Sequence, residues 1–218
     1  MEYKRLTLFA GHYGSGKTNI AVNYALKMKK DGHDVTIADL DIVNPYFRTK
    51  DSKEELDAAG IRLLSSEFAN SNVDLPALPS EMYELVENKS RHAVLDIGGD
   101  DRGAFALGRY TPFILEENDY EMLFVINKYR PLTPDAESTV EIMREIEAAS
   151  GIPFTAIVNN SNVGVETSWD DIQSSFEYAN EVSRLTGLEV KFTSLADFVE
   201  AGSYDGELLR MTLQKKII

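Results

Sequence analysis

The hydrophobic positions of this chain fall into short continuous runs, and longer amphipathic stretches separate them. The runs are rich in Val, Ile, Leu and Phe, and they lack the alternation of a strand with one wet face. Continuous runs of this kind are typical of strands that are buried on both faces of a parallel sheet. The predicted strands span residues 5–10, 34–38, 61–64, 92–97, 121–126, 154–158 and 188–192.

The amphipathic stretches predict helices over residues 18–30, 79–87, 103–117, 133–149, 168–185 and 207–218. In the helix over 133–149, Thr133 is the expected N-cap, Pro134 takes the first helical position and Gly151 follows the end. Strands that alternate with helices imply right-handed crossovers. We therefore expect one domain over residues 1–218, an α/β fold with a single doubly wound, mostly parallel sheet and helices on both faces.

Composition narrows the classes of function. The chain has 218 residues, a formal net charge of −14 and no cysteine. The absence of cysteine excludes disulfides, thiol catalysis and thiolate-ligated metals, and the acidic surface argues against nucleic-acid binding. No apolar run reaches the length of about 18 residues that a membrane-spanning helix requires, and the N-terminus lacks the pattern of a signal peptide. We expect a cytoplasmic protein without membrane attachment.

A glycine-rich segment follows the first predicted strand and matches the pattern G-x-x-x-x-G-K-[ST] in full. Its residues are Gly11, His12, Tyr13, Gly14, Ser15, Gly16, Lys17 and Thr18. Glycines let the backbone curl around a phosphate with its N–H groups inward, and the N-terminus of the next helix adds partial positive charge. Lys17 supplies a cation for the β- and γ-phosphates, and Thr18 offers a hydroxyl to Mg²⁺. The segment predicts a nucleoside triphosphate site, and with it a P-loop NTPase fold.

Three aspartates end strands at the edge of the sheet where this segment lies. Asp39 and Asp41 close the second strand and, two apart in extended backbone, point the same way. Asp96 closes the strand over 92–97 and precedes two glycines. Carboxylates beside a triphosphate make sense when a cation or a water lies between them, and Asp96 can hold Mg²⁺ directly or through water. The alternative is a set of turn or cap aspartates that face solvent.

The stretch Asn127-Lys128-Tyr129-Arg130 begins like the guanine-reading pattern N-K-x-D, but Arg130 replaces the aspartate. A carboxylate is the group that accepts hydrogen bonds from guanine N1–H and N2. Its absence favours ATP over GTP. We interpret the stretch itself as a plain strand-to-helix loop.

The order of these motifs resembles the MinD/ParA-type ATPases, the CobQ/CobB/MinD/ParA nucleotide-binding domain, over nearly the whole chain. The resemblance rests also on Asn159-Asn160-Ser161-Asn162-Val163-Gly164 after the strand over 154–158. It implies that Lys17 and Asp41 are catalytic, with Asp41 positioning the attacking water, and that Asp39 and Asp96 support the magnesium shell. It further implies that Asn159, with Asn160 second, reads the adenine edge, and that ATP and Mg²⁺ are the cofactors.

One departure from the family lies in the loop. Most members carry a second lysine near its start, which reaches across a dimer to the partner's nucleotide. This chain has His12 there, followed by Tyr13. A histidine replaces that lysine only when protonated or as a hydrogen-bond donor. The alternative is that His12 is an ordinary loop residue.

The leading hypothesis is a slow Mg²⁺-dependent ATPase that acts as a nucleotide switch on a protein partner of unidentified kind. A homodimer is a further expected assembly. In this reading, residues 39–48 and 98–102 respond to hydrolysis, and Arg48 or Arg102 is a candidate arginine finger. Two alternatives stay open. One is a small-molecule kinase or ATP-dependent ligase of the dethiobiotin-synthetase type, with the loop over 65–78 framing a pocket. The other is a protein that binds nucleotide without turnover.

Overall fold

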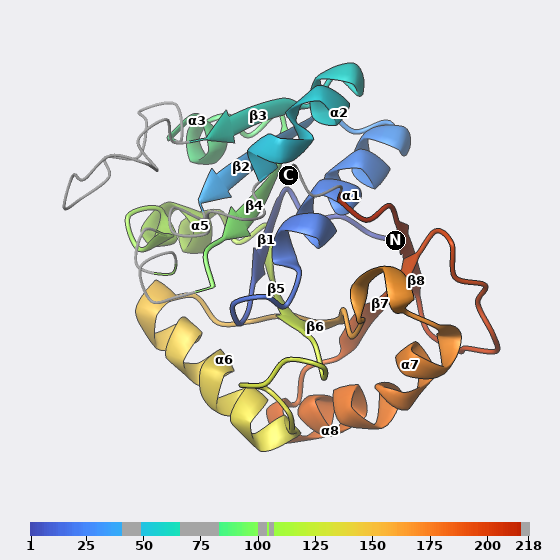
Figure 1. Ribbon diagram of the computed structural model, residues 1–218. Coiled ribbons are helices and arrows are strands. Elements are labelled where there is room, and N and C mark those ends of the chain that lie inside the picture. The colour runs from blue at the N-terminus through green and yellow to red at the C-terminus, as the bar shows by residue number, and fades with distance from the viewer. Residues whose placement is uncertain (41–48, 66–82, 100–103, 105–106, 215–218) are drawn as a thin grey trace, which may run out of the picture.

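The computed structural model describes residues 1–40, 49–65, 83–99, 104 and 107–214. Within them, eight strands form one sheet in the order β3-β2-β4-β1-β5-β6-β7-β8, and all neighbouring strands are parallel (Figure 1). The strands are β1 (Leu6–Ala10), β2 (Val35–Leu40), β3 (Arg62–Ser65), β4 (His92–Ile97), β5 (Tyr120–Ile126), β6 (Ala156–Asn159), β7 (Val190–Ala196) and β8 (Leu208–Met211). The predicted fold class, a doubly wound parallel sheet, is confirmed.

Helices cover both faces of the sheet (Figure 1). They are α1 (Lys17–Lys30), α2 (Lys53–Ala58), α3 (Tyr83–Glu87), α5 (Thr111–Glu117), α6 (Ala136–Ser150), α7 (Trp169–Ser174) and α8 (Phe176–Thr186), with short 3-10 turns η1 (Thr49–Ser52) and η3 (Gly164–Glu166). In the described part of the chain, none of these helices has the length and apolar character needed to cross a membrane.

Alternate residues of the central strands enter two large apolar cores, one on each face, and a third, smaller cluster packs Leu195 and Ala196 of β7 with Ile172 of α7. Phe9 of β1 packs with Ile20 of α1 and Leu56 of α2 on one face. Leu8 of β1 packs with Met143 of α6 and Val182 of α8 on the other face. Burial on both faces explains why the strands read as continuous apolar runs in the sequence.

The central position of β1 places the glycine-rich segment in the middle of one sheet edge. β1 lies between β4 and β5, with β2 and β3 beyond β4 on one side and β6, β7 and β8 beyond β5 on the other. The carboxyl end of β1 is therefore the point where the connections diverge, which is where ligands bind in open α/β sheets.

Several predicted elements change in detail. The single helix predicted over 168–185 is two helices, α7 and α8, that meet at Ser175. The cap of α6 is Asp135 rather than Thr133, because the Asp135 side chain accepts a hydrogen bond from the Ser138 N–H. Gly151 ends α6 in the left-handed conformation as expected. Helix α2 was not predicted.

The predicted helix over 207–218 is wrong in its described part. Leu208–Met211 is strand β8, which pairs in parallel with β7 and alternates buried and exposed side chains. The Asn23 side chain of α1 continues this edge, since it bonds both the N–H and the carbonyl of Thr212. An apolar stretch this short fits either periodicity, and pairing with β7 decides in favour of the strand.

Candidate functional site

The segment over residues 11–18, named here the phosphate loop, joins β1 to α1 through three glycines with positive φ. The φ angles are 155° at Gly11, 78° at Gly14 and 90° at Gly16. Two of these positions also lack space for a side chain. A Cβ on Gly11 would lie 2.4 Å from the Val125 carbonyl oxygen, and one on Gly16 would lie 2.2 Å from Asn160 Nδ2. The loop therefore requires glycine for both conformation and packing.

Lys17 closes the phosphate loop on itself. Its ammonium donates to the His12 carbonyl oxygen at 3.2 Å, and the same oxygen accepts from the Ser15 N–H at 3.1 Å. Gly16 is the N-cap of α1, and no side-chain hydrogen bond to this cap exists among the described residues. The loop thus combines a lysine ammonium with a helix N-terminus, the two features that attract phosphate.

Two of the predicted metal ligands lie side by side at the same edge. Asp39 and Asp96 are register partners on β2 and β4, and both carboxylates are buried. Asp96 also neighbours Phe9 of β1, and its Oδ2 accepts from Thr49 Oγ1 at 3.0 Å. Adjacent buried carboxylates are costly unless a cation or a donor neutralises them, so this pair suits Mg²⁺. Thr18, the third predicted ligand, is buried at the start of α1.

Gly99, just beyond β4, lies directly against the phosphate loop. A Cβ at Gly99 would lie 2.7 Å from Lys17 Nζ, and 2.8 Å from the Tyr13 nitrogen. The close approach explains the glycine that the sequence places three residues after Asp96. It also brings a backbone segment next to the lysine that would hold a terminal phosphate.

Asn159 and Asn160 lie at the end of β6, and their side chains serve the protein itself. Asn159 Nδ2 donates to Ser175 Oγ at 2.9 Å. Asn160 Nδ2 donates to the Ser15 carbonyl at 2.6 Å, and Asn160 Oδ1 accepts from Ser194 Oγ at 2.6 Å. Both asparagines are buried. The structure thus gives Asn160 a role in holding the phosphate loop, and the expected contact of both residues with adenine stays a prediction.

His12 does not supply the positive charge of a lysine at neutral pH. Burial, followed by the positive charge of Lys17, holds the pKa of the His12 imidazole below its usual value. The ring is therefore neutral near pH 7. The next residue, Tyr13, has half of its surface exposed.

The loop after β5 contributes an unexpected neighbour. The stretch that begins at Asn127 is a turn, as interpreted from the sequence, but the Arg130 side chain lies against the phosphate loop. A Cβ at Gly14 would lie 3.8 Å from both Cδ and Nε of Arg130. Thr49 is a second residue that sequence reasoning missed. Thr49 belongs to no local motif, and the pattern around Arg130 gives no sign of its contact with the phosphate loop, so only the fold reveals the place of these two residues.

Some predicted residues lie outside the described part of the chain. These are Asp41, Arg48, Arg102 and most of the loop over 65–78. Their expected roles stay predictions. Among the described residues, no group of three or more metal-binding side chains occurs. A magnesium ion held by two carboxylates, a hydroxyl and water needs no such group.

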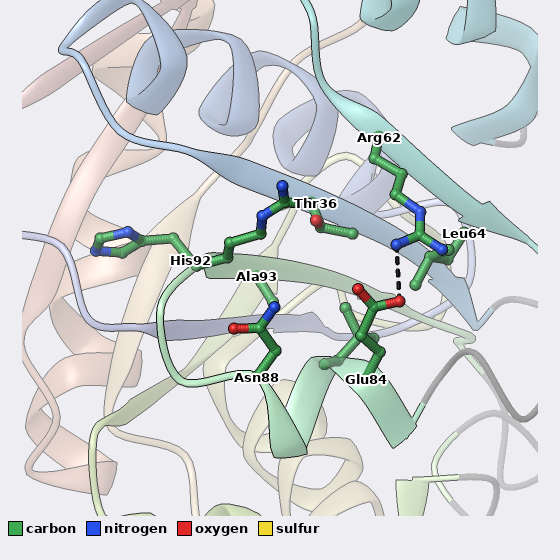
Figure 2. A pocket seen from close by; sticks show the side chains of 9 residues that line it. Thr36, Arg62, Leu64, Glu84, Asn88, His92 and Ala93 are labelled. Carbon is green, nitrogen blue, oxygen red and sulfur yellow. Dashed lines mark hydrogen bonds and ion pairs between the residues drawn. The ribbon is translucent and has the colours of Figure 1, made fainter.

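Two of the hollows on the described surface lie apart from the phosphate loop. Figure 2 shows the first, about 10 Å³, at the amino ends of β2, β3 and β4, where Arg62 pairs with Glu84 at 2.7 Å. The second, about 360 Å³, lies beside α6 and α8 and is lined by Asp135, Glu137, Glu177 and Glu181. The first lies at the opposite edge of the sheet, and the carboxylates of the second would repel a phosphate.

The all-parallel sheet, the central first strand and the glycine-rich loop at its carboxyl end define the class of protein: this is a P-loop NTPase fold. Solved structures of the same architecture support this class. No protein-family model and no curated protein sequence matches the chain.

Three solved structures illustrate the likeness. Cell division protein FtsY from Thermotoga maritima has a TM-score of 0.58 and 16% identity, over 91% of this chain and 62% of its own. The signal recognition particle receptor FtsY from Elizabethkingia anophelis, in complex with GDP, has a TM-score of 0.54 and 13% identity, over 89% and 58%. The signal recognition particle 54 kDa protein from Aeropyrum pernix, in complex with GDP, has a TM-score of 0.53 and 16% identity, over 94% and 43%. This chain spans less than two thirds of each, and the likeness is one of fold.

Proposed function

We propose that this protein binds Mg·ATP in the phosphate loop and hydrolyses it slowly, as a nucleotide switch of the MinD/ParA type that acts on a protein partner. The observation that carries the proposal is the loop itself. Its glycines have positive φ. Lys17, the first residue of α1, donates from its ammonium to the His12 carbonyl oxygen at 3.2 Å. Such a nest of backbone and one ammonium binds polyphosphate even on a chain of net charge −14.

In this proposal, Asp39, Asp96 and Thr18 hold Mg²⁺, directly or through water. The metal would supply charge neutralisation for the phosphoryl group. The side-by-side buried carboxylates of Asp39 and Asp96 support this assignment. The hydroxyl of Thr49 fixes Asp96 Oδ2 and so orients the Asp96 carboxylate.

The other groups act on the phosphates and the water. Lys17 and the N-terminus of α1 bind the phosphates and stabilise charge that develops on them. Gly99, adjacent to Lys17, lies where a backbone amide meets the terminal phosphate. Asp41 orients the attacking water, a role that the MinD/ParA resemblance assigns.

We propose ATP rather than GTP as the nucleotide. Two of the similar structures contain GDP, which makes guanine the direct competitor. In this chain, the end of β6 presents Asn159 and Asn160, and Arg130 stands where the guanine-reading pattern has aspartate. These positions carry no carboxylate to accept from the guanine N1–H and N2 groups.

We propose hydrolysis rather than transfer onto a small acid because the MinD/ParA resemblance assigns Asp41 the positioning of a water. A kinase or ligase would need a pocket for its second substrate beside the terminal phosphate. The loop expected to frame such a pocket, over residues 65–78, lies outside the described residues apart from Ser65.

Phosphate release tests the proposal. The wild-type protein is assayed with ATP and with GTP, each with Mg²⁺ and with a chelator, and beside it an Asp41→Asn variant. We expect slow, Mg²⁺-dependent release that prefers ATP, and an Asp41→Asn variant that binds nucleotide but loses turnover. Preference for GTP would overturn the base assignment. Binding without turnover in both proteins would instead establish a nucleotide-binding protein that lacks hydrolysis.

A further inference from the structure

The loop after β5, residues 127–133, is fixed by its own hydrogen bonds. The Asn127 carbonyl accepts from the Arg130 N–H at 3.2 Å and from Thr133 Oγ1 at 3.3 Å. Asn127 Oδ1 accepts from the Tyr129 N–H at 3.0 Å. A turn with both backbone and side-chain bonds fixes the direction in which its side chains leave.

Two side chains of this turn are committed to the region of α7. Lys128 Nζ donates to the Ser174 carbonyl at 2.8 Å, and the Tyr129 hydroxyl donates to the Asp171 carbonyl at 2.7 Å. Both residues therefore anchor the turn to a neighbouring helix. Arg130 is directed elsewhere, to the phosphate loop at Gly14.

Within the described part of the chain, the Arg130 guanidinium makes no hydrogen bond and no ion pair. Its Nε is buried without a hydrogen-bond partner. A buried donor on a charged group is costly when it stays unpaired. A side chain kept in this state at a functional loop points to a ligand that pairs with it.

The charges around Arg130 specify the sign of that ligand. Lys17 is the cation within the loop itself, and His12, close to both Lys17 and Arg130, is neutral near pH 7. Two cations flank one glycine-rich loop, so the complementary group is an anion. A guanidinium offers fixed, paired donors that match phosphate oxygens, and it keeps its charge at every physiological pH.

We infer that Arg130 is the second cation of the phosphate site and binds a phosphate of the nucleoside triphosphate from the Gly14 side of the loop. The inference rests on the proposed function. In this arrangement, Arg130 supplies from the same chain the positive charge that His12 lacks. A cis-acting arginine of this kind stabilises the charge of a transferring phosphoryl group.

The test compares wild type with Arg130→Gln, Arg130→Lys and a control, Arg144→Gln. Arg144 pairs with Glu147 at 2.6 Å on the exposed side of α6, so the control removes the same charge away from the site. Two quantities are measured for each protein: the thermal midpoint without nucleotide, and the affinity for Mg·ATP by titration calorimetry.

We expect Arg130→Gln to keep the nucleotide-free midpoint and to bind Mg·ATP about tenfold or more weakly. Arg130→Lys should recover part of the affinity, and Arg144→Gln should bind as wild type. If Arg130→Gln lowers the midpoint and leaves the affinity unchanged, Arg130 is a packing residue and the inference is wrong. If wild type itself fails to bind any nucleoside triphosphate, the proposed function fails first, and the two failures are thereby distinguished.

Discussion

Single residues at the phosphate loop act mainly through the space they leave and the bonds they fix. Gly99 is the clearest case, because its missing side chain admits Lys17 Nζ and the Tyr13 backbone. Its φ lies outside the left-handed region, so alanine fits the backbone there but not the neighbours. A side chain at this position would therefore disturb both the Tyr13 backbone and the Lys17 ammonium.

A Gly99→Ala variant should lose about 1–3 kcal/mol of unfolding free energy, because its Cβ would lie 2.8 Å from the Tyr13 backbone nitrogen. It should also bind Mg·ATP at least about tenfold more weakly, because the same Cβ would lie 2.7 Å from Nζ of Lys17, the lysine proposed to hold the phosphates. Thermal unfolding checks the fold, and titration calorimetry measures affinity. Wild-type affinity in this variant would mean that Gly99 does not approach the phosphates.

Asn160 connects two parts of the chain that are far apart in sequence. Its amide donates to the Ser15 carbonyl and its oxygen accepts from Ser194. An Asn160→Ala variant should lose about 1–3 kcal/mol of unfolding free energy, because buried partners stay unpaired. Chemical denaturation measures this loss.

Asn160→Asp gives the matched comparison. Aspartate still accepts from Ser194 but places a carboxylate beside the Ser15 carbonyl and near the phosphates. We expect it to weaken Mg·ATP binding more than Asn160→Ala does. The reverse order would show that a negative charge at position 160 weakens nucleotide binding less than the loss of the Asn160 hydrogen bonds does.

The limits of sequence reasoning are clear at this scale. The phosphate loop is a local motif, since the glycines, Lys17 and Thr18 follow one another and their chemistry reads directly. The contacts of Asn160 with Ser15 and of Arg130 with Gly14 depend on the order of strands in the sheet. No local pattern encodes these contacts.

Among the elements, the strands at the sheet centre were predictable and the last strand was not. The apolar run of β4 (His92–Ile97) is buried on both faces and matches the predicted bounds. Strand β8 lies at the edge of the sheet and exposes Arg210, so its pattern resembles that of a short amphipathic helix. Its strand conformation depends on pairing with β7, which sequence alone does not reveal.

A substitution pair tests the strand assignment of residues 208–211. Leu209 is buried and Arg210 is exposed. Leu209→Ala should lower the unfolding free energy by about 2–5 kcal/mol, and Arg210→Ala by less than about 1 kcal/mol. Equal losses in denaturant titrations would contradict the alternation that a strand requires.

At the scale of the whole molecule, one acid-sensitive contact lies far from the phosphate loop. His92, at the amino end of β4, packs edge-on against His33 with ring centroids 4.6 Å apart. Burial, then the charge of His33, holds the pKa of His92 below its usual value. Below a pH of about 6.5, His92 therefore binds a proton in the unfolded chain more readily than in the folded protein.

The unfolding free energy should consequently fall as pH drops from 7 toward 5. Above pH 7 both the folded and the unfolded chain keep His92 neutral, so His92 causes no loss of stability there. His12 has a lowered pKa and acts in the same direction. A His92→Gln variant should show a shallower decline than wild type when denaturation midpoints are compared at pH 7.5 and 5.5. An unchanged decline would mean that His92 does not contribute to acid sensitivity.

The central claim is that the phosphate loop captures a polyphosphate on an otherwise acidic molecule, and Lys17 is the group on which that capture depends. Titration of wild type and a Lys17→Ala variant with Mg·ATP tests it most directly. The account predicts saturable heat for wild type and affinity reduced at least about a hundredfold for Lys17→Ala, with both proteins folded. Equal binding by the two proteins, or no binding by wild type, would contradict it.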